Sequence, residues 1–216
     1  MKLPIIIIGA GGHAAVVADA LLAAGETVLG FTDPDPRRHG QRLCGLLVLG
    51  DDAVLVAPGN APDRTRLANG IAGVRGTALR QQVQQRLQAQ GWQFCAVRHP
   101  SAIVSRFASI GEGVQLLAAS VVQAGAEIEA GCIVNTAAVV EHDCRLAEHV
   151  HVAPRALICG EVEVGARCHI GAGAVVRQGL RLGEDTLVGA GAVVVKSFAG
   201  AGTLVGVPAS VKEIVP

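Results

Sequence analysis

The most regular feature of the chain is an aliphatic residue at every sixth position of its second half. The series runs unbroken through sixteen positions: Val104, Ile110, Leu116, Val122, Ile128, Val134, Val140, Leu146, Val152, Ile158, Val164, Ile170, Val176, Leu182, Val188 and Val194. A small residue usually stands two places earlier, as at Ala126, Cys132 and Ala138. Residues two apart on a strand point to the same face. Each hexad therefore puts one small and one branched side chain inward and then turns a corner.

Three such hexads close a triangular coil of eighteen residues, and the series predicts a stack of about five coils around one aliphatic core. A β-sandwich with regular turns is the alternative. It needs strands of varied length and aromatic or branched cross-strand pairs, whereas only 2% of the residues are aromatic. The pattern favours a parallel β-helix over residues 101–216, including a C-terminal cap, and does not by itself fix the handedness.

The first half, residues 1–100, follows a different pattern, in which strands alternate with helices. The expected strands are Leu3 to Ile8, Thr27 to Phe31, Ala53 to Ala57 and Phe94 to Val97. A helix is expected from Ala14 to Ala24, and a Gln-rich helix carries Leu79, Val83 and Leu87 on one face. This half is predicted to be a small Rossmann-like α/β domain.

Charge and cysteine usage narrow the class of protein. Eighteen basic and eighteen acidic residues give a net charge of zero without a Lys/Arg block, which argues against nucleic acid or an anionic membrane as a partner. The early apolar run is too short for a membrane span, so we expect a cytoplasmic protein. The six cysteines show no metal-ligand spacing, and we expect small core residues and no metal.

A glycine-rich turn is the first candidate for chemistry. Gly9-Ala10-Gly11-Gly12-His13-Ala14 separates an expected strand from an expected helix, and Asp33 follows the second strand. Glycines let a phosphate approach the backbone at a helix N-terminus, and the carboxylate can accept hydrogen bonds from ribose or base. A tight turn without a ligand is the alternative. Four strands are too few for a dinucleotide fold, so a nucleotide or nucleotide sugar is expected.

The second candidate is Glu141-His142-Asp143. His142 lies two places after an inward aliphatic residue, so it should face outward. A neighbouring carboxylate orients the imidazole and stabilises its protonated form, which suits a general base. His39, His99, His149 and His169 are expected to be inert, as most surface histidines are.

Both halves together resemble the nucleotide-sugar acetyltransferases and sialic-acid O-acetyltransferases (NeuD-like) of the hexapeptide-repeat superfamily. The resemblance spans nearly the whole chain, through residues 9–13, 30–33, 59–64, 99–102, 135–136, 141–144 and 205–209. It implies a left-handed β-helix, an acetyl-CoA co-substrate and a homotrimer. Asp143 is a shorter carboxylate than the Glu of some members.

The same resemblance assigns roles to individual residues. It implies His142 as the base, Asp143 as the group that raises its basicity, and Asn135 as an active-site residue. The residues expected to contact the sugar nucleotide are Gly11, Gly12, His13, Asp33 and Gly59. Those expected to contact acetyl-CoA are His151, Gly160, Ala172 and Ala190.

We therefore expect an acetyl-CoA-dependent N-acetyltransferase acting on a UDP- or GDP-linked deoxyamino sugar, by direct attack on the thioester. A sugar O-acetyltransferase of the sialic-acid type uses the same base and stays open. Two further alternatives are a non-catalytic β-helix binding protein and a nicotinamide-dependent oxidoreductase. The first should have no affinity for CoA, and the second should bind NAD at the glycine turn.

Overall fold

A computed structural model describes residues 2–56, 60–73 and 78–212 of the protein. The chain divides into two compact units, one of residues 1–72 and 79–100 and one of residues 73–78 and 101–216.

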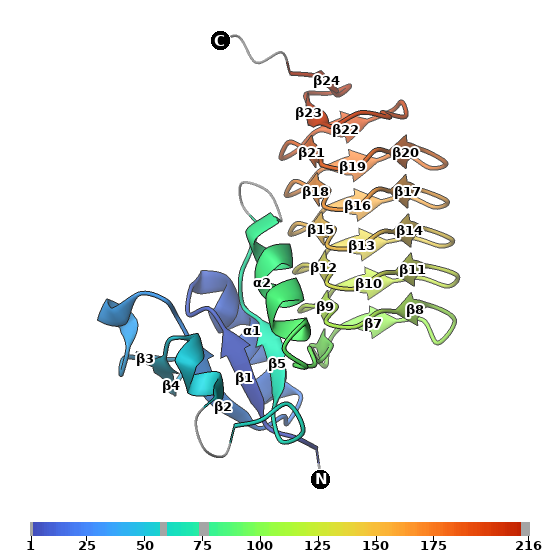
Figure 1. The fold of residues 1–216 in the computed structure, drawn as a ribbon. Helices are drawn as coiled ribbons and strands as arrows, with labels where there is room; N and C mark the ends of the chain where they lie inside the picture. The colour runs from blue at the N-terminus through green and yellow to red at the C-terminus, as the bar shows by residue number, and fades with distance from the viewer. Residues whose placement is uncertain (1, 57–59, 74–77, 213–216) are drawn as a thin grey trace. The chain divides into compact units, whose positions relative to one another are not determined.

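The first unit is built on a five-stranded sheet with the order β3-β4-β2-β1-β5 (Figure 1). Its strands are β1 (Ile5–Ile8), β2 (Val28–Thr32), β3 (Arg42–Leu43), β4 (Leu46–Gly50) and β5 (Arg66–Asn69). Strand β1 pairs in parallel with both β2 and β5, and the short β3 pairs antiparallel with β4 at the edge. The other elements are α1 (Gly12–Ala23), η1 (Pro36–Arg38), η2 (Asp52–Val56), α2 (Ala78–Gln88) and β6 (Val97–Arg98).

The four isoleucines of β1 explain why this strand is central. All four are buried, as expected for a parallel strand covered on both faces. On one face Ile7 packs near Ala14 of α1, and Gly70 lies against both side chains. A Cβ on Gly70 would come 2.8 Å from Ile7 and 2.7 Å from Ala14, so there is no room for one. On the other face Ile6 packs with Leu87 of α2. The expected Rossmann-like architecture is confirmed.

Two of the four expected strands differ in the structure. Residues 52–56 form the 3-10 helix η2, and the strand on the other side of β1 is β5. A short apolar run fits a strand and a buried helical turn equally well, and here the side chain of Asp51 accepts a hydrogen bond from the amide of Ala53, which starts the turn. Where a strand was expected from Phe94 to Val97, Phe94 makes an isolated bridge to Leu67, and β6 begins only at Val97. The hairpin formed by β3 and β4 was not anticipated.

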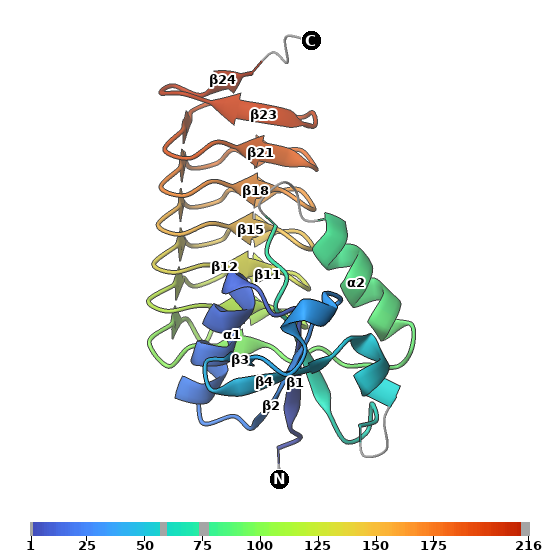
Figure 2. The same ribbon diagram turned by 90° about the vertical axis from the view of Figure 1, so that its left-hand side faces the viewer.

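The second unit is a β-helix of sixteen short strands, β7 to β22, with β23 and β24 closing its C-terminal end (Figures 1 and 2). The β13 sheet contains β7 (Ile103–Val104), β10 (Val121–Val122), β13 (Val139–Val140), β16 (Leu157–Ile158), β19 (Val175–Val176) and β22 (Val193–Val194). The β14 sheet contains β8 (Ser109–Ile110), β11 (Glu127–Ile128), β14 (Arg145–Leu146), β17 (Glu163–Val164) and β20 (Arg181–Leu182). The β15 sheet contains β9 (Gln115–Leu116), β12 (Ile133–Val134), β15 (His151–Val152), β18 (His169–Ile170), β21 (Thr186–Val188), β23 (Gly202–Val205) and β24 (Ser210–Val211).

Each strand pairs in parallel with the strand one coil later, so that Val121 faces Val139 and Val139 faces Leu157. The hexad residues form one continuous buried core together with the small residues that precede them, such as Ala126 and Cys132. The expected stack of about five coils is confirmed, and the fold is the left-handed β-helix implied by the resemblance.

The corners between the sheets follow a fixed backbone rule. From Gly113 to Gly191, one residue at each turn adopts a left-handed φ near +60°, whether it is a glycine such as Gly131 or not, as at Ala137 and Asp143. Some glycines are needed for another reason: a Cβ on Gly111 would come 2.7 Å from the amide nitrogen of Ala130 in the next coil. The repeat thus positions side chains at each corner in vertical columns with a spacing of eighteen residues.

Across residues 2–56, 60–73 and 78–212, none of the helices combines the length and the apolar character that crossing a membrane requires.

Candidate active site

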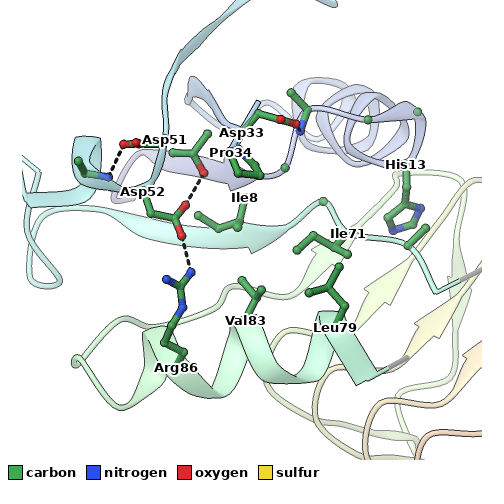
Figure 3. Close-up of a pocket in the computed structure, with 18 residues that line it drawn as sticks. Ile8, His13, Asp33, Pro34, Asp51, Asp52, Ile71, Leu79, Val83 and Arg86 are labelled. Atoms are coloured by element: carbon green, nitrogen blue, oxygen red, sulfur yellow. Dashed lines mark hydrogen bonds and ion pairs between the residues drawn. The ribbon is translucent and has the colours of Figure 1, made fainter. Parts of the chain in front are cut away.

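The glycine turn of the first unit lies at the mouth of a cavity of about 690 Å³. Strand β1 ends at Ile8, and α1 begins at Gly12 with Gly11 as its N-cap residue. A Cβ on Gly11 or Gly12 would meet nothing within 4 Å, so this backbone is open to the cavity (Figure 3). A helix N-terminus directs its first amides and a favourable dipole toward an anion. A volume of this size suits a nucleotide-sized ligand.

Asp33 holds the glycine turn in place. Its Oδ2 atom accepts a hydrogen bond of 2.9 Å from the amide of Ala10, and its Oδ1 atom accepts one of 3.0 Å from the amide of Asp35. Arg38 donates from Nη1 to the carbonyl oxygen of Ala10 at 2.5 Å. Because each oxygen of an ionised carboxylate has two acceptor positions, Asp33 keeps capacity for a ligand while it fixes the loop.

A second polar network crosses the cavity (Figure 3). Thr32 donates from its hydroxyl to Oδ1 of Asp52 at 3.0 Å, and Arg86 of α2 forms an ion pair with Oδ2 of the same carboxylate. Asp51 also lines the cavity. Sequence reasoning missed Asp51, Asp52 and Arg86, because it placed a strand where η2 begins. Identifying β4 would have put the two aspartates at a strand end, where ligands bind in such sheets.

Four of the five expected nucleotide-sugar contacts, Gly11, Gly12, His13 and Asp33, line this one cavity. The fifth, Gly59, lies outside the described residues.

In the second unit, His142 and Asp143 lie at the corner between the β13 and β14 sheets. Nδ1 of His142 and Oδ2 of Asp143 are 2.9 Å apart, and both side chains are more than half exposed. This hydrogen bond raises the pKa of His142 above its ordinary value, and the nearby carboxylates of Glu141 and Glu161 act in the same direction. The bond at Nδ1 leaves Nε2 as the ring nitrogen that can take a proton from a ligand.

Asn135 and His151 form a second pair. Nδ2 of Asn135 lies 3.1 Å from Nε2 of His151, while Oδ1 of Asn135 accepts a hydrogen bond of 2.8 Å from the amide of Thr136. With its oxygen used in this way, the Asn135 amide donates to His151 Nε2. His151 faces away from the aliphatic core but is only 5% exposed. Its ring makes an edge-to-face contact with His169, the centroids being 4.8 Å apart, and burial lowers the pKa of His169.

These two pairs occupy different corners of the chain. Asn135 lies in the turn between the β15 and β13 sheets, on the same side of the coil as Ala172 and Ala190. Gly160 shares the corner of His142 and lies directly against its ring. One chain therefore does not bring Asn135 to His142, but both corners border the same β13 sheet.

Three of the buried cysteines are poor candidates for a nucleophile. Burial raises the pKa of Cys95, Cys144 and Cys168 to about 11, so these thiols are neutral and unreactive near pH 7. Within the described ranges, no three His, Cys, Asp or Glu side chains form a group that could hold a metal ion.

Comparison with known proteins gives two family matches. Residues 4–87 match the PglD N-terminal domain, and residues 143–178 match the bacterial transferase hexapeptide model of six repeats.

Several solved structures are similar over the full length. PerB from Caulobacter crescentus, solved with CoA and GDP-perosamine, is 39% identical, with 99% of each chain covered and a TM-score of 0.90. The acetyltransferase domain of PglB from Neisseria gonorrhoeae FA1090 is 34% identical, over 98% of this chain and 100% of that chain, with a TM-score of 0.89. WeeI from Acinetobacter baumannii AYE is 27% identical over 98% of this chain and 100% of its own, with a TM-score of 0.85.

Proposed function

Because the chain belongs to the hexapeptide-repeat sugar acetyltransferases with a PglD-type N-terminal domain, we propose that it N-acetylates a nucleotide-linked deoxyamino sugar with acetyl-CoA as the acetyl donor. The observation that carries this proposal is the identity of 39% over 99% of both chains to PerB, whose structure holds CoA and GDP-perosamine. Acetyl-CoA is also bound in a structure of the PglB acetyltransferase domain. The cavity at the glycine turn and the His142–Asp143 pair are the two parts that such a reaction needs.

In the proposed reaction the sugar amine attacks the thioester carbonyl directly. Nε2 of His142 takes the amine proton as the C–N bond forms, and Asp143 stabilises the imidazolium through Nδ1. Backbone amides at the corner hold the oxyanion. The C–S bond then breaks, and the proton on His142 passes to the CoA thiolate. Direct attack is supported by the high pKa of the Cys144 thiol, since a protonated thiol is a poor nucleophile.

We assign the nucleotide to the cavity of the first unit. Its diphosphate approaches the open backbone of Gly11 and Gly12, near His13. Asp33 fixes the loop and has acceptor capacity left for the ribose or base. The network of Asp52 and Arg86 lines the same cavity. Whether the carrier is UDP or GDP is decided by the acceptor experiment below.

We further propose that the enzyme is a homotrimer that buries the β13 sheet. The outward residues of this sheet form an aliphatic row: Ile103, Val121, Val139, Leu157, Val175 and Val193. The outward row of the β14 sheet is charged instead, with ion pairs between Arg145 and Glu127 and between Arg181 and Glu163. A continuous apolar row favours burial against another copy of the chain.

A trimer of this kind also explains the separation of the two corners. Both corners border the β13 sheet, so both lie at the edges of the buried surface. His142 of one chain then shares a site with Asn135 of the partner subunit, and acetyl-CoA lies between neighbouring β-helices. In this arrangement His151, Gly160, Ala172 and Ala190 line the acetyl-CoA groove. We place the enzyme in the cytoplasm, where acetyl-CoA is available to it and its six free cysteines stay reduced.

The test is an acceptor panel with release of the CoA thiol as the readout. The panel contains UDP- and GDP-linked amino sugars, the matching N-acetylated sugars, free sialic acid and a blank without acceptor. We expect release with one amino-sugar nucleotide and none with its N-acetylated form. Release with sialic acid alone would mean O-acetylation, and the absence of CoA binding would favour a non-catalytic protein.

A further inference from the structure

The His142–Asp143 pair lies between two glycines that belong to the neighbouring coils. Gly125 stands one coil before Asp143, and Gly160 stands one coil after His142. Asp143 occupies the space that a side chain on Gly125 would fill, and His142 occupies the space that a side chain on Gly160 would fill.

The ring of His142 lies on the Cα atom of Gly160. A Cβ at this position would be 2.5 Å from Nε2 and 2.6 Å from Cε1 of the ring, far inside van der Waals contact. The backbone itself does not require glycine here, because His142 and Gln178 occupy the same corner position in the coils on either side. Glycine at position 160 therefore leaves room for the imidazole ring of His142.

The carboxylate of Asp143 lies on Gly125 in the same way. A Cβ on Gly125 would come closer than 3.0 Å to Oδ1. Gly125 has a left-handed φ of +74°, but Asp143 and Glu161 adopt the same conformation at the same corner without being glycine. Gly179 continues this column with a φ of +67°, and a Cβ there would meet nothing within 4 Å. Only Gly125 faces the carboxylate.

We propose that Gly125 and Gly160 are positioning residues, which together hold Asp143 and His142 in their hydrogen-bonded geometry. A side chain at 125 pushes the carboxylate away from Nδ1. A side chain at 160 turns the ring and moves Nε2 from the place where the amine proton is delivered. The catalytic meaning of this arrangement rests on the proposed function, but the arrangement itself can be measured without substrate.

The first experiment is a titration of His142 by NMR of its ring carbon Cε1 in the full-length protein, with the signal assigned by its loss in His142→Ala. We expect Asp143→Ala to lower the midpoint, and Gly125→Ala to lower it in the same direction. In the Asp143→Ala background, Gly125→Ala should change nothing further. The control Gly179→Ala introduces the same side chain at the same left-handed corner position and should titrate like the wild type.

A folded Gly125→Ala variant with the midpoint of the wild type would overturn the proposal. Because no substrate is involved, the titration decides this point even if the acceptor panel shows no N-acetylation. The unfolding midpoints of Gly125→Ala and Gly179→Ala separately measure how much stability is lost when alanine takes the left-handed φ, because both positions have this backbone conformation.

The second experiment is kinetic and concerns Gly160. We expect Gly160→Ala to lower kcat by at least about tenfold, because the base is displaced but not removed. Any rise in the KM for acetyl-CoA reports separately on the contact that Gly160 makes in the proposed acetyl-CoA groove. In the His142→Ala background it should have no further effect on kcat. A raised KM for acetyl-CoA with kcat unchanged would contradict the positioning role and leave Gly160 as a CoA contact alone.

Discussion

Nδ1 of His142 lies 2.9 Å from Oδ2 of Asp143, although the two residues are neighbours in the sequence and both side chains are exposed. Adjacent residues on a regular strand point to opposite faces. Here they meet because Asp143 occupies the left-handed corner position with a φ of +58°, which turns its side chain back toward the preceding residue. The corner of the β-helix thus creates the pair that the proposed chemistry uses.

Replacement of this carboxylate should change the pH dependence of the reaction. Asp143 raises the pKa of His142, and the base must be neutral to accept a proton. In Asp143→Asn the pKa falls, so the acid limb of the kcat/KM profile moves to lower pH, while the plateau drops by about tenfold or more because the base is weaker. Thiol release measured from pH 5 to 9 checks this.

Asp185→Asn is the matched control for that profile, since Asp185 is also an aspartate at a left-handed corner but pairs with Arg167. An unshifted acid limb in Asp143→Asn would show that the pair does not set the basicity of His142.

Loss of Asp33 should impair binding of the sugar nucleotide selectively. Asp33→Ala removes the acceptor that holds the Ala10 amide, and the glycine turn loosens. We expect the KM for the nucleotide sugar to rise by about tenfold or more, a loss of roughly 1.4 kcal/mol in binding, with the KM for acetyl-CoA unchanged. Asp35→Ala, two residues away and paired with solvent-exposed Arg37, is the control. Equal rises in both KM values would refute a nucleotide role for this cavity.

The proposed trimer should depend on the aliphatic row of the β13 sheet. Leu157→Arg places a charge in the centre of this row, where it would be buried without a partner. Light scattering should then give the mass of one chain, 22.0 kDa, in place of three. Arg181→Glu on the charged β14 sheet should leave the trimer intact. A trimer that survives Leu157→Arg would mean that another surface joins the subunits.

The thiols provide a test of direct attack. Cys44 is exposed and Cys159 is partly exposed, whereas Cys95, Cys132, Cys144 and Cys168 are buried. A disulfide reagent should react quickly with Cys44, more slowly with Cys159, and with the buried thiols only after unfolding, and Cys44→Ser should remove the fastest phase. We expect that variant to retain full acetyl transfer. Loss of activity when a buried cysteine alone is modified in the folded protein would point to a covalent intermediate.

The sequence predicts the β-helix well because its rule is local. Every hexad repeats the same inward pair of a small and a branched residue, such as Ala126 with Ile128, so the position of each strand follows from the one before it. The same rule places His142 outward at a corner. The first unit is harder to predict, since the run after Asp52 has no periodicity that separates a strand from a 3-10 helix.

Contacts between distant residues could not be predicted from the sequence. The ion pair of Asp52 with Arg86 joins residues far apart in the chain, and the pairing of Asn135 with His151 depends on side-chain rotamers at one corner. The close contacts of His142 with Gly160 and of Asp143 with Gly125 likewise depend on three-dimensional distances. In the sequence these glycines look like all the others of the repeat.

In the proposed mechanism, His142 deprotonates a sugar amine during acetyl transfer. The most direct test is acceptor-dependent thiol release from acetyl-CoA by the wild type and by folded His142→Ala, with the amino-sugar nucleotide that proves productive. We expect kcat to fall by about 10²-fold or more in the variant, as is typical for removal of a general base. A folded variant whose turnover stays within about threefold of the wild type would contradict the role of His142, given that magnitude.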